Sequence, residues 1–259
     1  MAFWGDYHTH TIYSHGKGSV EDNVLAALAR GLKQIAITDH GFRHITYQVR
    51  RMDWPFVIRD VEAMRQKYPE IEIFLGLETN FTSLSGRIDI LPSDMRYLDI
   101  VVCGYHKLVK PHRARNFFKM CMPNFLLSTV GKTTAKQTAR NTDAYIKALE
   151  KYDNDIISHI NHGAQVDARA VAEAAAHYGT YVELNCKNMH GGQASMTDTE
   201  LEQVLTTDVE FIVDSDAHAP EKIGHFEKAI EIIDRVGIPY ARIANWERLP
   251  VLRSHRGRL

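Results

Sequence analysis

Nine side chains of types that bind metal ions lie in short polar stretches that follow apolar segments of this chain. They are His8, His10, His15, His40, Glu78, His106, His159, Asp216 and His218. Apolar runs lead into several of them, as in QIAITDH, IEIFLGLE, DIISH and EFIVDSDAH. The strands of a parallel α/β barrel all end at one mouth, so residues far apart in the sequence can meet there. The pattern predicts a metal centre, and therefore a metalloenzyme.

Local spacing supports this prediction at two places. His8 and His10 are two residues apart, so a strand would direct both side chains to the same side. Asp214, Asp216 and His218 repeat this spacing after an apolar run, and they combine oxygen with nitrogen donors. Neutral imidazole is a ligand for zinc, manganese or iron. Both segments are therefore suited to binding a divalent cation.

Each of these motifs also has an ordinary structural explanation. His15 could be a loop histidine, Asp39 before His40 could cap a helix, and Glu78 could be an exposed residue at the start of a loop. A carboxylate at position 78 could instead bridge two cations with its two oxygens. The joint occurrence of these residues at successive strand ends favours the metal centre.

The organisation of the chain is that of a parallel α/β barrel, because strand-like and helix-like patterns alternate. We expect strands at Phe3–Tyr7, Gln34–Thr38, Ile71–Leu77, Leu98–Cys103, Asp155–Ile157, Thr180–Leu184 and Val209–Val213. We expect helices at Val20–Arg30, Phe56–Tyr68, Ala135–Tyr152, Val166–His177, Thr197–Leu205 and Glu227–Val236.

The first of these helices has clear end signals. Ser19 with Asp22 three residues later resembles a capping box, and Gly31 stands where the helix would stop. At the other end of the chain, Tyr240–Ala244 followed by Trp246–Leu252 could form an eighth strand or pack against the barrel. The sequence leaves seven and eight strands open.

Composition and charge indicate one ordinary globular domain over residues 1–259. The chain has 259 residues, 44% of them hydrophobic and 24% charged, and α/β barrels commonly have about 250 residues in one domain. A formal net charge of -1 predicts no general attraction to nucleic acid or to membranes. Three widely spaced cysteines make a disulfide framework improbable. We find no signal peptide and no run of about 18 apolar residues, so a cytoplasmic protein is expected.

A basic segment follows the expected fourth strand. Residues 100–142 contain no Asp or Glu but contain Lys107, Lys110, Arg113, Arg115, Lys119, Lys132, Lys136 and Arg140. We predict a long basic insertion at about residues 107–140. It could hang over the barrel mouth and attract anionic substrates, or it could be a solvated surface loop, and the sequence leaves both open.

The motifs together resemble those of the polymerase and histidinol phosphatase (PHP) domain family. The matching motifs are DYHTHT, His15, TDHG, GLE, GYH, ISH and SDAH, and they span nearly the whole chain. Within the family, the chain looks most like the small stand-alone bacterial phosphatases of the YcdX type. The resemblance implies a distorted (β/α)7 TIM-like barrel that holds three divalent metal ions, zinc or manganese, with iron also conceivable.

The resemblance also implies which residues bind each ion. His8, His10, Glu78 and Asp216 would bind one cation, His15, His40 and His218 a second, and Glu78, His106 and His159 the third. Glu78 would then be shared. The basic insertion after His106 is a departure from the closest members, so their substrate is not carried over.

A phosphate monoester is the substrate type that fits such a centre. Cations can neutralise its oxygens, and a metal-activated hydroxide can attack the phosphorus, so no protein nucleophile is needed. Arg43, Lys107 and Arg113 are the residues expected to contact the phosphate oxygens. Arg43 could equally form a surface salt bridge.

Three other functions remain open from the sequence. Metal-dependent amidohydrolases also begin with His-x-His in a barrel, but they usually bridge their metals through a modified lysine rather than a glutamate. A phosphodiesterase or exonuclease acting on nucleotides is the second, because the basic segment could follow a nucleic acid backbone. The third is a non-catalytic, metal-stabilised PHP module. Metal-dependent hydrolysis of a small phosphate monoester is the function that the sequence favours.

Overall fold

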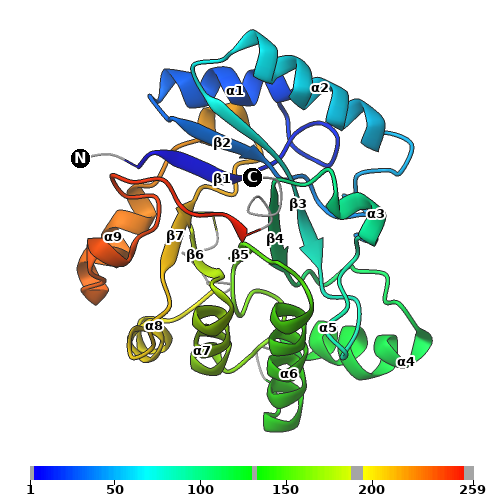
Figure 1. Cartoon of the computed structure of the whole chain (residues 1–259). Helices are drawn as coiled ribbons and strands as arrows, with labels where there is room; N and C mark the ends of the chain where they lie inside the picture. The colour runs from blue at the N-terminus through cyan, green and yellow to red at the C-terminus, as the bar shows by residue number, and fades with distance from the viewer. Residues whose placement is uncertain (1–2, 130–132, 188–194, 254–259) are drawn as a thin grey trace.

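Seven parallel strands form a nearly closed barrel in the order β1 to β7, as the family resemblance implies (Figure 1). The structure is a computed structural model that describes residues 3–129, 133–187 and 195–253. The strands are β1 (Gly5–Thr9), β2 (Gln34–Ile37), β3 (Glu72–Asn80), β4 (Ile100–Gly104), β5 (Ile156–Ile157), β6 (Tyr181–Asn185) and β7 (Phe211–Asp214). Each strand pairs in parallel with the next one along the chain.

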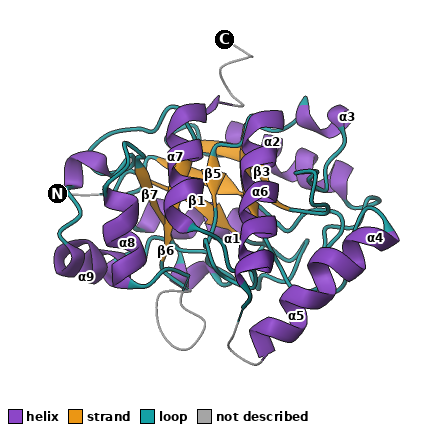
Figure 2. Cartoon of the chain, turned by 90° about the horizontal axis from the view of Figure 1, so that it is seen from below, coloured by secondary structure: helices purple, strands orange, loops and turns teal. Residues whose placement is uncertain are grey.

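Helices cover the outside of the barrel (Figure 2). The six predicted helices are present as α1 (Val20–Ala29), α2 (Trp54–Lys67), α6 (Ala135–Lys151), α7 (Ala168–Tyr178), α8 (Asp198–Leu205) and α9 (Glu227–Val236). A short α3 (Pro92–Met95) and two 3-10 turns, η2 (Pro220–Lys222) and η3 (Tyr240–Arg242), were not predicted. No helix in the described residues is both long and apolar enough to cross a membrane.

The predicted ends of α1 are confirmed. The Ser19 hydroxyl accepts a hydrogen bond from the Asp22 backbone N–H at 3.1 Å, and the Asp22 carboxylate accepts one from the Ser19 N–H at 2.8 Å. Gly31 follows the helix with φ of 72°, a conformation that glycine adopts without steric cost. Local sequence therefore fixes the entry and exit of the first βα unit.

Each strand buries both of its faces, which explains why the strands read as continuous apolar runs. On β2, Ile35 and Ile37 pack in the large cluster between strands and helices, whereas Ala36 belongs to a smaller, separate cluster. That smaller cluster contains one or two residues from every strand: Tyr7, Ala36, Phe74, Ile100, Val102, Ile156, Tyr181 and Ile212, with Ala244 and Leu252. Since side chains alternate between the two faces of a strand, we assign the smaller cluster to the barrel interior.

The segment after α9 closes the barrel without adding an eighth strand. β1 and β7 meet directly near the mouth, where the His10 N–H donates to the Ala217 carbonyl at 2.9 Å and the Tyr7 N–H donates to the Asp214 carboxylate at 2.7 Å. Farther from the mouth, Asn245 lies between the two strands. Its side-chain amide donates to the carbonyls of Gly5 at 3.0 Å and Val213 at 2.7 Å, and it accepts from the Val213 N–H at 3.1 Å.

The basic segment after β4 is largely helical rather than a long loop, which corrects the expectation. It forms α4 (Ala114–Asn116), a π-helical turn η1 (Phe117–Cys121) and α5 (Met122–Thr129). In Figures 1 and 2, α4 and α5 lie at one side of the molecule. Asn124 and Asn141 exchange side-chain hydrogen bonds of 3.1 and 2.9 Å, which connect α5 to α6. A contact between polar side chains produces no periodic pattern of apolar residues, so the sequence offered no signal for the packing of α5 on α6.

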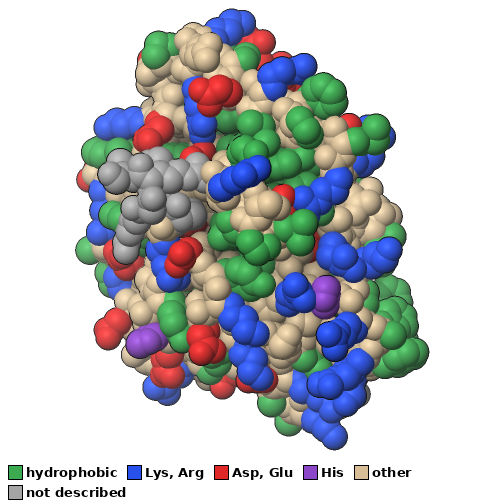
Figure 3. All heavy atoms as spheres, turned by 45° about the vertical axis from the view of Figure 1, so that its right-hand side comes forward, with side chains coloured by type: hydrophobic (Ala, Val, Ile, Leu, Met, Phe, Trp, Pro, Cys, Tyr) green, Lys and Arg blue, Asp and Glu red, His purple; other side chains and the backbone are tan. Residues whose placement is uncertain are grey.

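The surface on this side is both basic and apolar. In the lower right of Figure 3, Lys and Arg side chains gather beside hydrophobic ones, with few Asp or Glu among them. Phe117 is 46% exposed and Phe118 is 60% exposed, and their rings meet edge to face with centroids 5.3 Å apart. This combination is relevant to the choice between substrate classes below.

Replacing Asn245 with alanine should destabilise the fold by about 2–3 kcal/mol. The change leaves buried backbone groups of Gly5 and Val213 without their hydrogen-bond partner, and unsatisfied buried polar groups cost about 1–3 kcal/mol each. The free energy of unfolding in urea measures this effect. Gln203→Ala, an exposed change on α8, is the control and should stay close to wild type. Equal stability of the two variants would show that Asn245 does not hold the barrel closed.

Candidate metal centre

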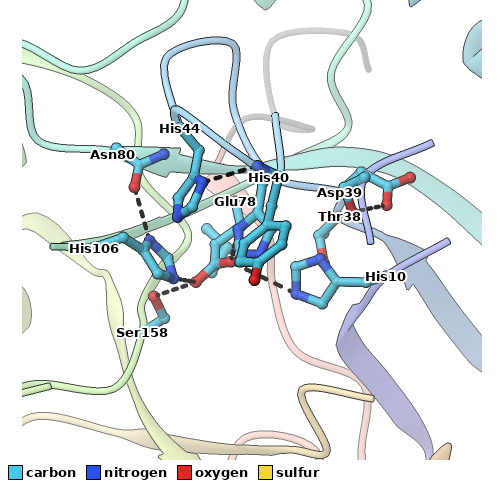
Figure 4. A network of polar contacts seen from close by, with 12 residues as sticks. His10, Thr38, Asp39, His40, His44, Glu78, Asn80, His106 and Ser158 are labelled. Carbon is cyan, nitrogen blue, oxygen red and sulfur yellow. Dashed lines mark hydrogen bonds and ion pairs between the residues drawn. The ribbon is translucent and has the colours of Figure 1, made fainter. Parts of the chain in front are cut away.

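The nine predicted residues converge at the mouth of the barrel. Glu78 lies at the centre, and histidines from several strand ends surround it (Figure 4). Glu78 Oε2 is 2.8 Å from His40 Nδ1 and 3.4 Å from His8 Nε2. Glu78 Oε1 is 2.7 Å from His159 Nε2 and 3.4 Å from His106 Nε2. One carboxylate near the end of β3 therefore touches an imidazole within β1 and imidazoles that follow β2, β4 and β5.

His10 connects this group to a second one. His10 Nε2 is 3.6 Å from Glu78 Oε2 and 3.3 Å from Asp216 Oδ1. The His10 ring lies 4.4 Å from that of His40 and 4.2 Å from that of His218, measured between centroids. His15 stands at the outer side, with its ring 4.1 Å from that of His218 and 4.9 Å from that of His40.

Three groups of these residues have donor atoms close enough to hold a metal ion. They are His8 with His10 and Glu78, His10 with His40 and His218, and His40 with Glu78 and His106. The first group agrees with the expected sharing of ligands. The other two groups differ from the expected ligand sets. In the group with His40 and His218, His10 stands where His15 was expected. In the group with Glu78 and His106, His40 stands where His159 was expected. The ion that each residue binds stays a prediction.

Unpartnered atoms in the cluster fit a centre built for cations. The buried polar atoms without a hydrogen bond in the described structure include His8 Nε2, both ring nitrogens of His10, His15 Nδ1, His40 Nδ1, His159 Nδ1 and Glu78 Oε2, although His40 Nδ1 and Glu78 Oε2 form a close ionic contact. Buried polar groups are normally hydrogen-bonded because leaving them bare costs free energy. Several imidazole nitrogens and a carboxylate oxygen that face one another in this way suit zinc, manganese or iron.

The acidic residues of the cluster are ionised. Burial alone would raise the pKa of Glu78, but His106, His8 and His40 and the hydrogen bond from His159 hold this pKa well below its usual range. Burial likewise opposes ionisation of Asp216, yet Lys187, His8 and His10 hold its pKa well below normal. Both carboxylates therefore present negative charge to the centre of the cluster at neutral pH.

Most of the imidazoles whose pKa is shifted are neutral, which is the form that binds metal. Burial, together with neighbouring His40 and His218, lowers the pKa of His10 well below its usual value. Burial, together with neighbouring His218 and His40, lowers the pKa of His15 to about 3. Burial also lowers the pKa values of His106 and His218.

His8 and His159 behave differently from the other imidazoles because carboxylates surround them. Burial lowers the pKa of His8, but Glu78, Glu183 and Asp216 outweigh it and raise this pKa well above normal. For His159, the hydrogen bond to Glu78 and the charge on Glu78 outweigh burial and raise the pKa. Metal binding at these two positions would therefore displace a proton.

The backbone bends where two of the ligands leave their strands. His159 has φ of 30° and Asp216 has φ of 49°, values that are uncommon for residues other than glycine and that concentrate at functional sites. β7 ends at Asp214, whose carboxylate accepts from the Tyr7 N–H across the seam. The predicted alternation of residues 214, 216 and 218 on one strand face is therefore wrong. Asp216 and His218 reach the cluster from a bent loop instead.

Glu183 on β6 is the main residue that the sequence analysis missed. Its Oε1 is 2.5 Å from His8 Nδ1, and its Oε2 accepts hydrogen bonds from the His159 N–H at 2.7 Å and the Asn185 amide at 2.9 Å. Glu183 is fully buried. A carboxylate that binds the second nitrogen of a ligating histidine fixes its orientation. The available signal was a charged residue inside a strand-like run, YVELN.

Asn80 and Asp39 support other parts of the cluster in the same way. Asn80 Oδ1 lies 2.7 Å from His106 Nδ1, and Asp89 in turn accepts from the Asn80 side chain at 3.0 Å. Asp39 accepts from the Thr11 N–H at 2.7 Å and from its hydroxyl at 2.6 Å. Asp39 therefore anchors the loop after β1 that carries His15.

His44 and Tyr47 form an aromatic wall beside the cluster that was not predicted. The His44 ring stacks on that of His40 with centroids 5.1 Å apart, and the Tyr47 ring stacks on that of His15 at 4.1 Å. Burial and the neighbouring His40 lower the pKa of His44 to about 4, so this imidazole is neutral at pH 7. His162 lies beside the cluster as well, with its ring 5.2 Å from that of His159.

The three residues predicted to contact phosphate are not part of the cluster. The Arg43 guanidinium donates to the carbonyls of Lys110 at 2.8 Å and Pro111 at 3.0 Å, so it holds the loop after β4. Lys107 is half-buried in that loop, and Arg113 is exposed just before α4. Within the described residues, none of the three hydrogen-bonds to the nine cluster residues, and their role in phosphate binding stays a prediction.

Lys187, which was not predicted, contacts the cluster directly. Its ammonium lies 3.0 Å from His218 Nδ1 and 3.5 Å from Asp216 Oδ1. The lysine follows β6 and is exposed at the mouth. It therefore brings a positive charge to the edge of the cluster.

Comparison with known proteins gives consistent results. A model of the PHP domain matches residues 6–230. A probable phosphatase of Shewanella loihica is 30% identical over 99% of this chain and 97% of its own length. Probable phosphatase YcdX of Escherichia coli is 29% identical over 93% of this chain and 89% of its own length.

Two solved structures share the fold. Histidinol phosphate phosphatase of Lactococcus lactis, in complex with zinc, L-histidinol and phosphate, aligns with a TM-score of 0.62 and 13% identity over 98% of both chains. A putative histidinol phosphatase of Listeria monocytogenes aligns with a TM-score of 0.59 and 14% identity over 87% of this chain and 99% of its own. At these identities, the structures establish the shared barrel alone.

Replacing Glu183 with glutamine should weaken metal binding by about 10–100-fold, the usual cost of losing a group that orients a ligating histidine. The variant keeps the size of the side chain but removes the charge that holds His8. Chelator competition measures the dissociation constant for zinc or manganese. Glu210→Gln, an exposed residue before β7, should bind metal as wild type does. Unchanged metal affinity in Glu183→Gln would contradict a positioning role for Glu183.

Proposed function

The chain belongs to the PHP domain family, and we propose that it hydrolyses a small phosphate monoester at a centre of three divalent cations. The family match and the full-length relatives named probable phosphatases make the chain a metal-dependent phosphoesterase. The observation that carries the proposal is the contact of Glu78 with imidazoles from four strand ends. Such a carboxylate can be shared among neighbouring cations.

The proposed ligand sets follow the family pattern. His8, His10, Glu78 and Asp216 would hold one cation, His15, His40 and His218 a second, and Glu78, His106 and His159 a third. Zinc or manganese suits this mixture of imidazole and carboxylate, and iron also fits. The Lactococcus lactis enzyme of the same fold holds zinc, which supports zinc as the first metal to test.

The cations would neutralise charge on the phosphate and activate the attacking water. The protein contributes the geometry: neutral imidazoles and two ionised carboxylates are already oriented before metal binds, which limits reorganisation during the reaction. The cysteines do not compete as nucleophiles. Burial raises the pKa of Cys121 to about 11, and it also raises the pKa values of Cys103 and Cys186, so all three stay protonated thiols.

Cationic residues near the mouth would bind the phosphate group itself. We propose Lys107 and Arg113 for this role because both follow His106 in the segment between β4 and α4. Arg43 contributes by holding that loop through the carbonyls of Lys110 and Pro111. These basic residues would favour an anionic substrate over a neutral ester.

A phosphodiester of a nucleotide is the second candidate substrate. The exposed rings of Phe117 and Phe118 adjoin a segment with Lys110, Arg113 and Lys119 and no acidic residue. Aromatic rings beside basic side chains can stack on bases while holding the phosphate backbone. The location of this surface on α4, η1 and α5, to one side of the barrel, makes it secondary to the monoester proposal.

A direct test compares two chromogenic esters after loading the protein with zinc or manganese. We expect hydrolysis of p-nitrophenyl phosphate, a monoester, to exceed that of bis-p-nitrophenyl phosphate, a diester, in kcat/KM by at least about tenfold. The reason is that a dianionic monoester can place more charged oxygens on the cations. Faster hydrolysis of the diester would favour the nucleotide phosphodiesterase, and hydrolysis of neither would argue for a non-catalytic module.

Two ligand variants should fail in different ways. Glu78→Ala removes the shared carboxylate, so kcat/KM for p-nitrophenyl phosphate should fall at least about 10²-fold, as when a group that stabilises transition-state charge is lost, and extra metal should not restore it. His8→Ala removes one ligand, so part of its activity should return at high metal concentration. Glu72→Ala, at the opposite end of β3, is the control. Wild-type turnover in Glu78→Ala would refute the proposed centre.

A further inference from the structure

A pocket of about 510 Å³ adjoins the cluster on the side of β1, β6 and β7. Asp216 and His218 line it, so it opens beside two of the proposed metal ligands. Its volume is in the range of pockets that bind small ligands. Nothing in the metal centre or in the proposed phosphate contacts accounts for this space.

Four lysines line the pocket, and they come from three parts of the chain. They are Lys17, Lys187, Lys222 and Lys228. Backbone hydrogen bonds fix two of them near the cluster: the Lys17 N–H donates to the His218 carbonyl at 2.9 Å, and the Lys222 N–H donates to the Ala219 carbonyl at 2.9 Å. Lys228 lies in the first turn of α9. The fold therefore brings lysines from three separate stretches of the chain to one pocket.

The three acidic residues around the pocket offset only part of this charge. Asp216 faces His8 and His10 as well as Lys187, and Glu227 pairs with His225 at 3.4 Å. Glu221 is the other acidic residue that lines the pocket. In the part of the chain that the structure describes, Lys17, Lys222 and Lys228 take part in no ion pair. Four lysines against three carboxylates leave the lining with a formal charge of +1, and the three lysines without an ion pair could accept an anion.

The remaining lining is small and weakly polar. Cys186, Ser215, Ala217 and Ala219 all border the pocket, and all four are buried. Short side chains of this kind leave room for a compact carbon skeleton. A molecule that fills the pocket would thus place its carbon skeleton against a mostly apolar surface and its charged end near the lysines.

We propose that this pocket binds a second anionic group of the substrate, a phosphate or a carboxylate, while the cations hold the phosphate to be hydrolysed. This inference rests on the proposed phosphatase function. It restricts the substrate to small phosphate monoesters that carry another negative group, such as bisphosphates or phosphorylated carboxylic acids. Lys187 connects the pocket to the cluster, because it lines the pocket and its ammonium lies 3.5 Å from Asp216 Oδ1.

Two matched substrate pairs test the proposal and distinguish its two forms. Fructose 1,6-bisphosphate is compared with fructose 6-phosphate for a second phosphate, and 3-phosphoglycerate with glycerol 3-phosphate for a carboxylate. We expect the doubly anionic member of at least one pair to have a kcat/KM about tenfold higher or more, since a hydrogen bond between charged groups contributes about 1.5–3 kcal/mol. The pair that shows the preference identifies the anion.

The double variant Lys17→Gln, Lys222→Gln should reduce that preference about tenfold, mainly by raising KM for the doubly anionic member. Lys67→Gln, Lys147→Gln makes the same charge change at exposed lysines on α2 and α6 and should keep the wild-type preference. A wild-type protein that hydrolyses the two members of each pair with equal kcat/KM would overturn the inference. So would a double variant that keeps the preference, or one that slows both members of a pair equally.

Equilibrium binding separates this inference from the proposed function. Calorimetry on the metal-loaded protein should give at least about tenfold tighter binding of 3-phosphonopropionate than of propylphosphonate, and the pocket variant should abolish the difference. Equal affinities in the wild type would overturn the inference. If neither member of any ester pair is hydrolysed while the binding difference persists, the phosphatase proposal fails and the anion pocket stands.

Discussion

The structure depends on one buried carboxylate. Glu78 is 1% exposed, and an isolated charge at that depth would be strongly unfavourable. It is stabilised because imidazoles from the ends of four other strands come within 2.7–3.6 Å of its two oxygens. That requirement fixes where β1, β2, β4 and β5 must end relative to β3. The barrel supplies this arrangement, since all of its parallel strands terminate at one mouth.

A layer of hydrogen bonds around the cluster limits the movement of its histidines. Glu183 holds His8 and the backbone of His159, Asn80 holds His106, and Asp39 holds the loop after β1. Underneath, we place the smaller apolar cluster, with Tyr7 and Phe74 among its members, in the barrel interior. The uncommon backbone conformations of His159 and Asp216 persist because this surrounding structure determines them. The anion pocket lies outside this layer, where side chains are free to select a substrate.

Much of the fold and of the cluster could be predicted because local patterns encode them. Apolar runs located seven strands, and the observed ends of β2 and of α1 differ from the predicted ones by one residue at most. Because every strand end reaches the same mouth, the nine cluster residues could be found without knowing any distance. The family resemblance supplied the number of cations and the sharing of ligands, which spacing does not determine.

The missed features depend on contacts between distant residues. Glu183 meets His8 across 175 positions, Asn245 closes a seam with Gly5 across 240 positions, and Asn124 anchors α5 by a polar contact that leaves no periodic pattern. The residues after β7 looked like a continuing strand, but the left-handed backbone at Asp216 turns them toward the cluster. Lysines of the anion pocket are individually ordinary surface residues, and only the fold brings them together.

The most direct test of the central claim is anomalous X-ray scattering from crystals of the protein grown with zinc or manganese. The account predicts three anomalous peaks at the barrel mouth, with Glu78 oxygens about 2.0–2.2 Å from at least two of the ions. Peaks that avoid Glu78, or a barrel mouth without any bound ion at saturating metal, would contradict it.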